Sequence, residues 1–281
     1  MNGGRHPAQV RDVRTERFAW REAGRADAPT VLLLHGLGGG SLSWQPQLEA
    51  LGSRYRVAAW DLPGYGDAPP LLEGDDPAVL TFALLVEAVA DLIRDLGCQQ
   101  VHLVGISFGG MIAQYVAAQR PDLVRSLSLL ATSPQFGHDG TDPDAWRASR
   151  LADLDQGKQP ADFADAVLSR LAGPSITEAA MAQQLTAMSR ISAAALRRSI
   201  DCLITHDSTS QLGTITAPTQ CIVGELDDET PVPYARYLAG HIRGARLEIV
   251  PGAGHLLNAE AAELVNALLA DFVTRVEASP A

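Results

Sequence analysis

The sequence has few cysteines, a deficit of positive charge and no long apolar run. Its three cysteines, Cys98, Cys202 and Cys221, are odd in number and widely separated, which fits neither a disulfide framework nor a zinc site. Lys and Arg number 22 against 33 Asp and Glu, for a formal net charge of -11. A polyphosphate or an anionic lipid surface would be repelled by this charge, so we expect no nucleic-acid partner and no membrane partner.

Segments that would direct the chain to a membrane are also missing. Residues 1–7 are polar and lack the apolar stretch of a signal peptide, and no uncharged apolar run reaches the roughly eighteen residues of a spanning helix. We therefore expect a cytoplasmic protein. A chain of 281 residues that is 46% hydrophobic can bury a large core and fits one domain with an insertion.

Strands and helices alternate along the first half of the chain. Apolar runs predict a strand pair within 10–20 and strands at 31–34, 56–60, 101–104 and 124–131, and helical spacing predicts helices at 41–51, 81–96 and 111–120. This alternation is typical of an α/β protein with a mostly parallel, doubly wound sheet, whose ligands bind beyond the carboxyl ends of the strands.

The rhythm changes between residues 133 and 212. Helices are predicted there at 162–171, 177–188 and 193–203, with no strand among them. The sheet then resumes at 219–223 and 246–250, with helices at 232–239 and 258–276. The sequence therefore predicts a core of residues 1–132 and 213–281 that is interrupted by a helical cap of residues 133–212.

One stretch, V-H-L-V-G-I-S-F-G-G at 101–110, combines a buried strand, a tight turn and the start of a helix. Ser107 lies at the tip of the turn, where a strained backbone would push its hydroxyl out of the sheet. Flanking glycines leave room for strand and helix to approach each other. Because a lone G-x-S-x-G pattern also arises by chance, the alternative is a loop serine that caps the helix.

A nucleophilic serine needs a base and an acid, and both are expected after later strands. His255 follows the strand at 246–250 in a glycine-rich turn, and Asp227 follows the strand at 219–223. Glu225 and Asp228 are close enough in sequence to compete with Asp227 as the acid. His35 also follows a strand, and we expect it to shape its loop by hydrogen bonding.

The negative charge that develops on a substrate carbonyl oxygen is best stabilised by two backbone N–H groups. Phe108 is the first residue past the serine and is expected to supply one of them. Leu37 is expected to supply the other from the loop H-G-L-G-G-G at 35–40, where Gly36 and Gly38 let the backbone approach the substrate. This loop is not a phosphate-binding loop, because its spacing differs and no lysine follows.

Taken together, these motifs resemble the α/β-hydrolase family over nearly the whole chain. The resemblance is carried by L-L-H-G-L-G-G at 33–39, D-L-P-G-Y-G at 61–66, G-I-S-F-G-G at 105–110, A-P-T at 217–219, G-E-L-D at 224–227 and G-A-G-H at 252–255. The chain looks most like the small lidded members: 3-oxoadipate enol-lactonases, cofactor-free haloperoxidase-like esterases and carbon-carbon bond hydrolases of aromatic-ring degradation. The resemblance implies a serine hydrolase without metal or cofactor, whose cap sets substrate choice. Phe108 stands where many relatives carry Met, which implies a narrower pocket.

Several cap residues are candidates to contact a small-molecule substrate. Phe136, Trp146, Met181 and Met188 would line an apolar acyl or ring pocket, although such residues at helical spacing are more often core. Arg190 would hold a substrate carboxylate, the alternative being a solvated arginine.

Three functions follow from this sequence. The leading hypothesis is hydrolysis of a small carboxylic ester or lactone through an acyl-Ser107 intermediate. The second is hydrolysis of a carbon-carbon bond in a vinylogous diketone by the same residues, and the third is ligand binding without catalysis. The sequence leaves open whether the chain forms a homodimer.

Overall fold

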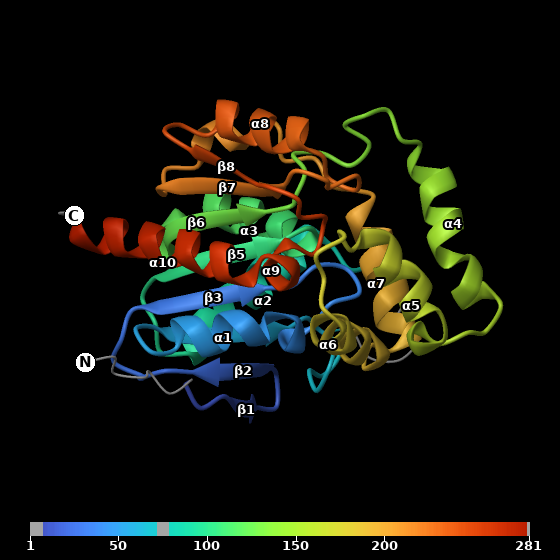
Figure 1. Cartoon of the computed structure of the whole chain (residues 1–281), viewed down its shortest axis with the longest axis horizontal. Coiled ribbons are helices and arrows are strands. Elements are labelled where there is room, and N and C mark those ends of the chain that lie inside the picture. Colours follow the sequence, from blue (N-terminus) through green and yellow to red (C-terminus); the bar gives the residue numbers. More distant parts are fainter. Residues whose placement is uncertain (1–7, 72–78, 280–281) are drawn as a thin grey trace.

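An eight-stranded sheet, covered by helices on both faces, forms the centre of the computed structural model (Figure 1). The structure describes residues 8–71 and 79–279; residues 1–7, which carry no signal-peptide pattern, lie outside it. The strands are β1 (Arg11–Arg14), β2 (Ala19–Ala23), β3 (Thr30–Leu34), β4 (Arg56–Asp61), β5 (Val101–Ile106), β6 (Val124–Leu130), β7 (Thr219–Gly224) and β8 (Arg246–Val250). Their order in the sheet is β1-β2-β4-β3-β5-β6-β7-β8, and every pair from β4 to β8 is parallel.

The helices form two layers around the sheet and a third group beyond the carboxyl ends of its parallel strands. They are α1 (Gln45–Leu51), α2 (Phe82–Asp95), α3 (Phe108–Gln119), α4 (Pro143–Asp155), α5 (Pro160–Leu171), α6 (Glu178–Ser189), α7 (Ala193–Leu203), α8 (Val232–His241), α9 (Leu257–Glu260) and α10 (Ala262–Ala278), with short 3-10 helices at Ser41–Trp44, Pro121–Leu123 and Leu212–Thr214. Apolar side chains of α1 and α10 pack on one face of the sheet, and those of α2, α3 and α8 pack on the other. Within the described residues, no helix combines the length and the apolar character needed to cross a membrane.

Strand β3 shows why the central strands read as unbroken apolar runs. Leu32 and Leu34 pack into the cluster with α2 and α3, whereas Val31 and Leu33 pack into the cluster with α1 and α10. All four side chains are fully buried because both faces of the sheet are covered. This double burial confirms the predicted doubly wound sheet.

Most predicted elements are present, with differences at their ends. Helix α3 begins at Phe108 rather than at Met111, so the glycines of the serine turn belong to its first turn. The predicted closing helix is divided at Ala261, whose φ of -117 and ψ of 42 separate α9 from α10. Helix α4 was not predicted, because only Leu151 and Leu154 of its side chains are buried and its apolar periodicity is weak.

All four helices from α4 to α7 come between β6 and β7. Figure 1 shows them grouped beyond the carboxyl ends of the parallel strands, at one end of the sheet. The helices predicted at 162–171, 177–188 and 193–203 correspond to α5, α6 and α7. We refer to residues 133–212 below as the helical insertion.

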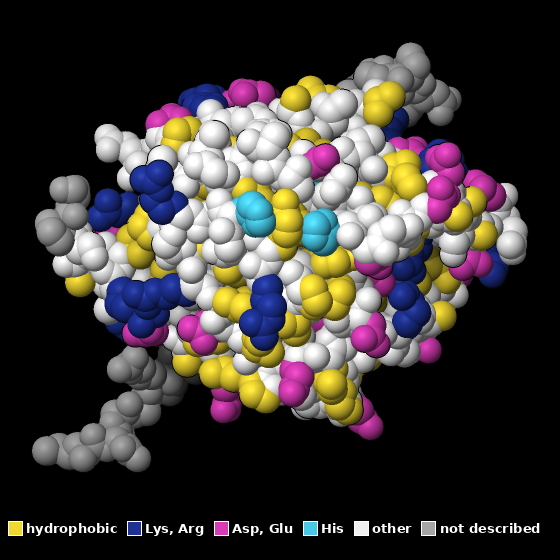
Figure 2. Space-filling model, turned by 90° about the horizontal axis from the view of Figure 1, so that it is seen from above, with side chains coloured by type: hydrophobic (Ala, Val, Ile, Leu, Met, Phe, Trp, Pro, Cys, Tyr) yellow, Lys and Arg dark blue, Asp and Glu magenta, His cyan; other side chains and the backbone are white. Residues whose placement is uncertain are grey.

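The start of the helical insertion contacts α8 through a row of aromatic rings. His138 lies edge-on to Tyr234 and Tyr237, with ring centroids 5.2 and 4.7 Å away, and His241 stacks on Tyr237 at 3.9 Å. Figure 2, seen from above the view of Figure 1, shows histidine side chains beside apolar ones on this face, with charges of both signs scattered around. His138 and His241 therefore pack against tyrosine rings of α8.

Candidate active site

Ser107 follows β5 directly and has a strained backbone. Its φ of 52 and ψ of -120 lie in a region that non-glycine residues rarely adopt. The turn is held on both sides, because the Ser107 N–H donates to the Leu130 carbonyl at 2.9 Å and the Ser107 carbonyl accepts from the Thr132 hydroxyl at 2.8 Å. This geometry points the serine side chain away from the end of the strand into the space beyond it.

The glycines around Ser107 are required by close backbone contacts. A Cβ on Gly105 would lie 2.3 Å from the Gly109 carbonyl oxygen, and a Cβ on Gly109 would lie 2.2 Å from the Leu34 carbonyl oxygen. A Cβ on Gly36 would lie 3.0 Å from the Ser107 Cβ. The turn therefore has no room for side chains at positions 105 and 109, as the motif predicts, and little room at the neighbouring position 36.

His255 and Asp227 form a buried pair. The His255 Nδ1 lies 3.0 Å from Asp227 Oδ2 and 3.1 Å from Oδ1, and the two residues are only 5% and 3% exposed. Asp227 Oδ1 also accepts from the backbone N–H groups of Glu229 and Thr230 at 3.0 and 2.9 Å, and Oδ2 accepts from the Thr230 hydroxyl at 2.9 Å. The carboxylate is thus fixed by four donors, including the imidazole.

Electrostatics favour the charged forms of both partners despite their burial. Burial alone would raise the pKa of Asp227, but the nearby imidazole and the hydrogen bonds outweigh it and the pKa is lowered. Burial alone would lower the pKa of His255, but the Asp227 carboxylate outweighs it and the pKa is raised. A proton on Nδ1 is therefore held toward Asp227, while Nε2 has no hydrogen-bond partner among the described residues.

Of the three acids that the sequence allowed, only Asp227 contacts the imidazole. Glu225 is exposed, and its carboxylate accepts from the Gly252 backbone N–H at 2.9 Å. Asp228 is exposed at the cavity wall and has no bond to His255. The choice of Asp227 as partner of His255 therefore follows from contact geometry.

The loop that carries His255 is held by the helical insertion. The His255 backbone N–H donates to the Leu171 carbonyl at 3.0 Å, and the Gly254 N–H donates to a Glu260 carboxylate oxygen at 2.9 Å. Gly173 and Gly254 cross so closely that a Cβ on Gly254 would lie 2.6 Å from the Gly173 nitrogen. Residues 171–173 thus help to position the histidine, a contact between distant segments that no local pattern predicts.

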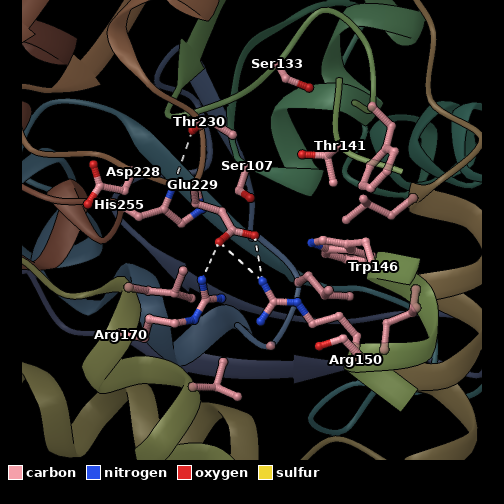
Figure 3. Close-up of a pocket in the computed structure, with 18 of the residues that line it drawn as sticks. Ser107, Ser133, Thr141, Trp146, Arg150, Arg170, Asp228, Glu229, Thr230 and His255 are labelled. Carbon is pink, nitrogen blue, oxygen red and sulfur yellow. Dashed lines mark hydrogen bonds and ion pairs between the residues drawn. The ribbon is translucent and has the colours of Figure 1, made fainter. Parts of the chain in front are cut away.

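Ser107 and His255 line the same cavity, which has a volume of about 410 Å³. Figure 3 shows both side chains at one side of this space, with Trp146 at the other. The sheet contributes residues that follow β3, β5, β7 and β8, and the helical insertion contributes most of the remaining wall. A space of this size between core and insertion suits a small molecule.

Some predicted substrate-binding residues line this cavity and others do not. Leu37, Gly38, Phe136, Trp146 and Met188 line it. Met181 and Arg190 do not line it, and these two predictions are wrong. Gly36 does not line it either but lies next to Ser107.

A Cβ on Gly36 would lie 3.6 Å from the Ser107 Oγ, and Met181 packs against the apolar core. The guanidinium of Arg190 pairs with the Asp67 carboxylate at 2.6 Å, outside the cavity. The Phe108 side chain is fully buried and lies edge-on to Phe82 at 5.8 Å, so it does not narrow the cavity.

Both expected oxyanion donors are free to receive a ligand. Neither the Leu37 N–H nor the Phe108 N–H has a hydrogen-bond partner among the described residues. His35 shapes the loop as predicted: its Nδ1 donates to the Gly36 carbonyl at 2.8 Å and its Nε2 accepts from the Leu62 N–H at 3.0 Å. Complete burial lowers the pKa of His35 to about 4, so the ring is neutral and keeps this tautomer.

The cavity residues that the sequence analysis did not predict include four with a clear polar role. Thr230 holds Asp227, and Arg150, Arg170 and Glu229 form a charged cluster on the wall. Glu229 and Thr230 belong to the acidic turn after β7, which gave a signal for them, whereas Arg150 lies on the unpredicted α4. The described residues contain no group of three or more His, Cys, Asp or Glu side chains arranged to hold a metal ion.

Comparisons with known proteins agree with this architecture. The family model described as "Alpha/beta hydrolase family" matches residues 31–268. The chain is 32% identical to a pimeloyl-[acyl-carrier protein] methyl ester esterase of Chromobacterium violaceum over 81% of this chain and 87% of that protein. It is 33% identical to a putative carbamate hydrolase RutD of Variovorax paradoxus over 91% and 95%. A solved hydrolase structure from Pseudomonas aeruginosa PA01 superposes with a TM-score of 0.82 at 26% identity, covering 97% of this chain and 99% of that one.

Proposed function

The chain belongs to the alpha/beta hydrolase family, and we propose that it is a serine hydrolase that cleaves a small carboxylic ester or lactone through an acyl-Ser107 intermediate. The observation that carries this proposal is the convergence on one cavity of three segments far apart in sequence. These segments supply a strained Ser107, the imidazole of His255 and the carboxylate of Asp227. Each residue type matches one role in acyl transfer.

In the first half of the proposed reaction, His255 Nε2 takes the proton from the Ser107 hydroxyl as its oxygen attacks the carbonyl carbon. Asp227 keeps the Nδ1 proton directed at itself and stabilises the imidazolium that forms. The tetrahedral intermediate places its negative oxygen between the N–H groups of Leu37 and Phe108. Its collapse breaks the bond to the leaving oxygen, which receives the proton from His255.

The second half repeats these steps with water. His255 takes a proton from a water molecule, whose oxygen attacks the acyl carbon of the acyl-serine. The second tetrahedral intermediate uses the same two N–H donors. When it collapses, Ser107 recovers its proton and the carboxylic acid is released.

Two further observations support an ester or lactone of small size and a role for the helical insertion. The names of these relatives refer to an ester and a carbamate, in which the bond to be cleaved joins the acyl carbon to a heteroatom and not to another carbon. Most of the cavity wall outside the triad comes from residues 133–212. We propose that this insertion acts as a lid that decides which acyl and alcohol parts fit.

A labelled fluorophosphonate tests the mechanism. We expect it to attach to the wild-type protein and to Ser149→Ala, which removes another serine of the cavity wall, but not to Ser107→Ala. Hydrolysis of nitrophenyl esters by Ser107→Ala should fall by at least about a thousandfold. Retention of the rate would refute the acyl-serine mechanism.

Two other results would replace the proposal by one of the competing hypotheses. Turnover of a vinylogous diketone far above that of esters would identify a carbon-carbon bond hydrolase. Tight ligand binding by the wild-type protein without any turnover would identify a binding protein.

A further inference from the structure

A charged cluster on the cavity wall has no role in the proposed triad. Arg150 Nη2 donates to Glu229 Oε1 at 3.0 Å and to Oε2 at 3.3 Å, and Arg170 Nη1 donates to Oε2 at 3.0 Å. The two arginines come from α4 and α5, and the glutamate comes from the turn after β7. Figure 3 shows both guanidinium groups reaching the same carboxylate, on the side of the cavity that also holds Ser107 and His255.

The cluster carries one surplus positive charge, because two guanidinium groups share one carboxylate. The other acidic residues of the cavity wall neutralise this surplus positive charge only weakly. Asp153 is paired with Lys158 at 2.7 Å, Asp139 is exposed and accepts from Thr141 at 2.7 Å, and Asp228 is exposed. Exposed carboxylates are screened by water and salt, whereas the Arg150 and Glu229 side chains, 23% and 22% exposed, are screened less; the Arg170 side chain is 51% exposed.

Most of the hydrogen-bonding capacity of the two arginines is unused. Each guanidinium has five N–H donors, yet among the described residues only Arg150 Nη2 and Arg170 Nη1 make hydrogen bonds. Arg150 lies over the Trp146 ring at 4.9 Å and its side chain is only 23% exposed. Its position is thus fixed in a partly dry site, where an anion would gain charge-assisted hydrogen bonds.

We propose that Arg150 and Arg170 form a subsite for a carboxylate of the substrate, remote from the bond that is cleaved. The inference rests on the proposed function and narrows its substrate class to half-esters of dicarboxylic acids and to lactones that carry a free carboxylate. A carboxylate matches the cluster because its single charge equals the surplus and its planar oxygens fit a guanidinium in a bidentate manner. A phosphate monoester, with a charge of about -1.5 to -2, would exceed that surplus beside Glu229.

Paired substrates test the subsite. Methyl half-esters of straight-chain dicarboxylic acids with four to eight carbons are compared with methyl esters of the monocarboxylic acids of equal length, by methanol release. For the wild-type protein we expect kcat/KM for the best half-ester to exceed that of its neutral partner at least tenfold, with the preference falling as sodium chloride is added. Arg150→Met and Arg170→Met should each reduce this ratio at least tenfold.

Arg190→Met is the matched control, because Arg190 is paired with Asp67 outside the cavity and the ratio should not change. A measurement on the wild-type protein avoids variants that fail to fold: free glutarate should inhibit neutral-ester hydrolysis competitively, and glutaramide at equal concentration should not.

Failure of the subsite and failure of the proposed function give different results. A wild-type ratio near one, or a ratio that the arginine substitutions leave unchanged while Ser107→Ala abolishes neutral-ester hydrolysis, would overturn the subsite alone. An equal loss on charged and neutral esters would mean that the arginines only hold the loop, and would also overturn it. Hydrolysis of both ester types by Ser107→Ala would overturn the proposed function.

Discussion

The substitution Asp227→Asn tests the proposed triad through the hydrogen bonds around one carboxylate. Oδ1 of Asp227 accepts from the two backbone N–H groups of Glu229 and Thr230. In the variant this position must be occupied by the amide oxygen, because an NH2 group there would face two donors. The amide NH2 then takes the place of Oδ2, 3.0 Å from the His255 Nδ1.

The consequence is a change of tautomer in the imidazole. An NH2 group 3.0 Å from Nδ1 favours acceptance by this nitrogen over its donation to the amide oxygen at 3.1 Å, so the ring proton moves to Nε2. Nε2 is the atom that must take the proton from Ser107, and it can no longer do so. We expect kcat to fall by about 10⁴, close to the loss for the equivalent change in a serine protease, which corresponds to about 5 kcal/mol of transition-state stabilisation.

Steady-state hydrolysis of a nitrophenyl ester measures this loss, and binding of an unreactive ester analogue shows whether the site is intact. Glu225→Gln is the control, because Glu225 is exposed and bonds only to the Gly252 backbone among the described residues; its rate should stay within about threefold of the wild type. If Asp227→Asn keeps its activity within about tenfold while folding normally, the tautomer argument is refuted.

Further predictions concern acid-base behaviour and packing. Because Asp227 raises the pKa of His255, the acid limb of kcat/KM should have its midpoint above 6.5, and a pH-rate profile with a midpoint below that value would contradict the pairing. Gly254→Ala would place a Cβ 2.6 Å from the Gly173 nitrogen, so kcat should fall about 100-fold and urea unfolding should show a loss of about 1–3 kcal/mol. Gly240 lies in α8, and a Cβ added to it would have no atom within 4 Å, so Gly240→Ala should instead raise the free energy of unfolding by about 0.5–1 kcal/mol. In the folded protein the pKa of His35 is about 4, whereas in the unfolded chain it is near 6.5. The unfolded chain therefore binds a proton first as the pH falls, and the free energy of unfolding should decrease by about 3 kcal/mol between pH 6.5 and 4. Urea unfolding at several pH values, compared with His35→Gln, measures this loss.

The features that depend on residues close together in the sequence could be predicted from the sequence alone. β3 and β5 are buried on both faces and therefore read as apolar runs. The glycines at 105 and 109 could be interpreted because a serine turn between strand and helix has few steric solutions. His255 could be chosen because only one histidine follows a late strand in a glycine-rich turn.

The parts that depend on contacts between distant segments could not be predicted. From the sequence Arg190 was expected to bind a substrate carboxylate. Its guanidinium instead donates to the carboxylate of Asp67, which lies in another loop, so its charge is neutralised outside the cavity. Arg150 was missed because α4 buries little and has a weak pattern, although tertiary contacts place this arginine at Glu229. Residue types alone do not show which arginine meets which carboxylate.

The hydrogen bond from the His255 backbone to the Leu171 carbonyl limits how this protein can be redesigned. A change of substrate by replacement of the helical insertion would have to preserve this bond. A graft here must bring a carbonyl to the place of Leu171 and a residue without a side chain to the place of Gly173, or the His255 imidazole loses part of its support. Chimeras that keep residues 171–173 and exchange only α4, α6 and α7 are therefore the ones expected to remain active.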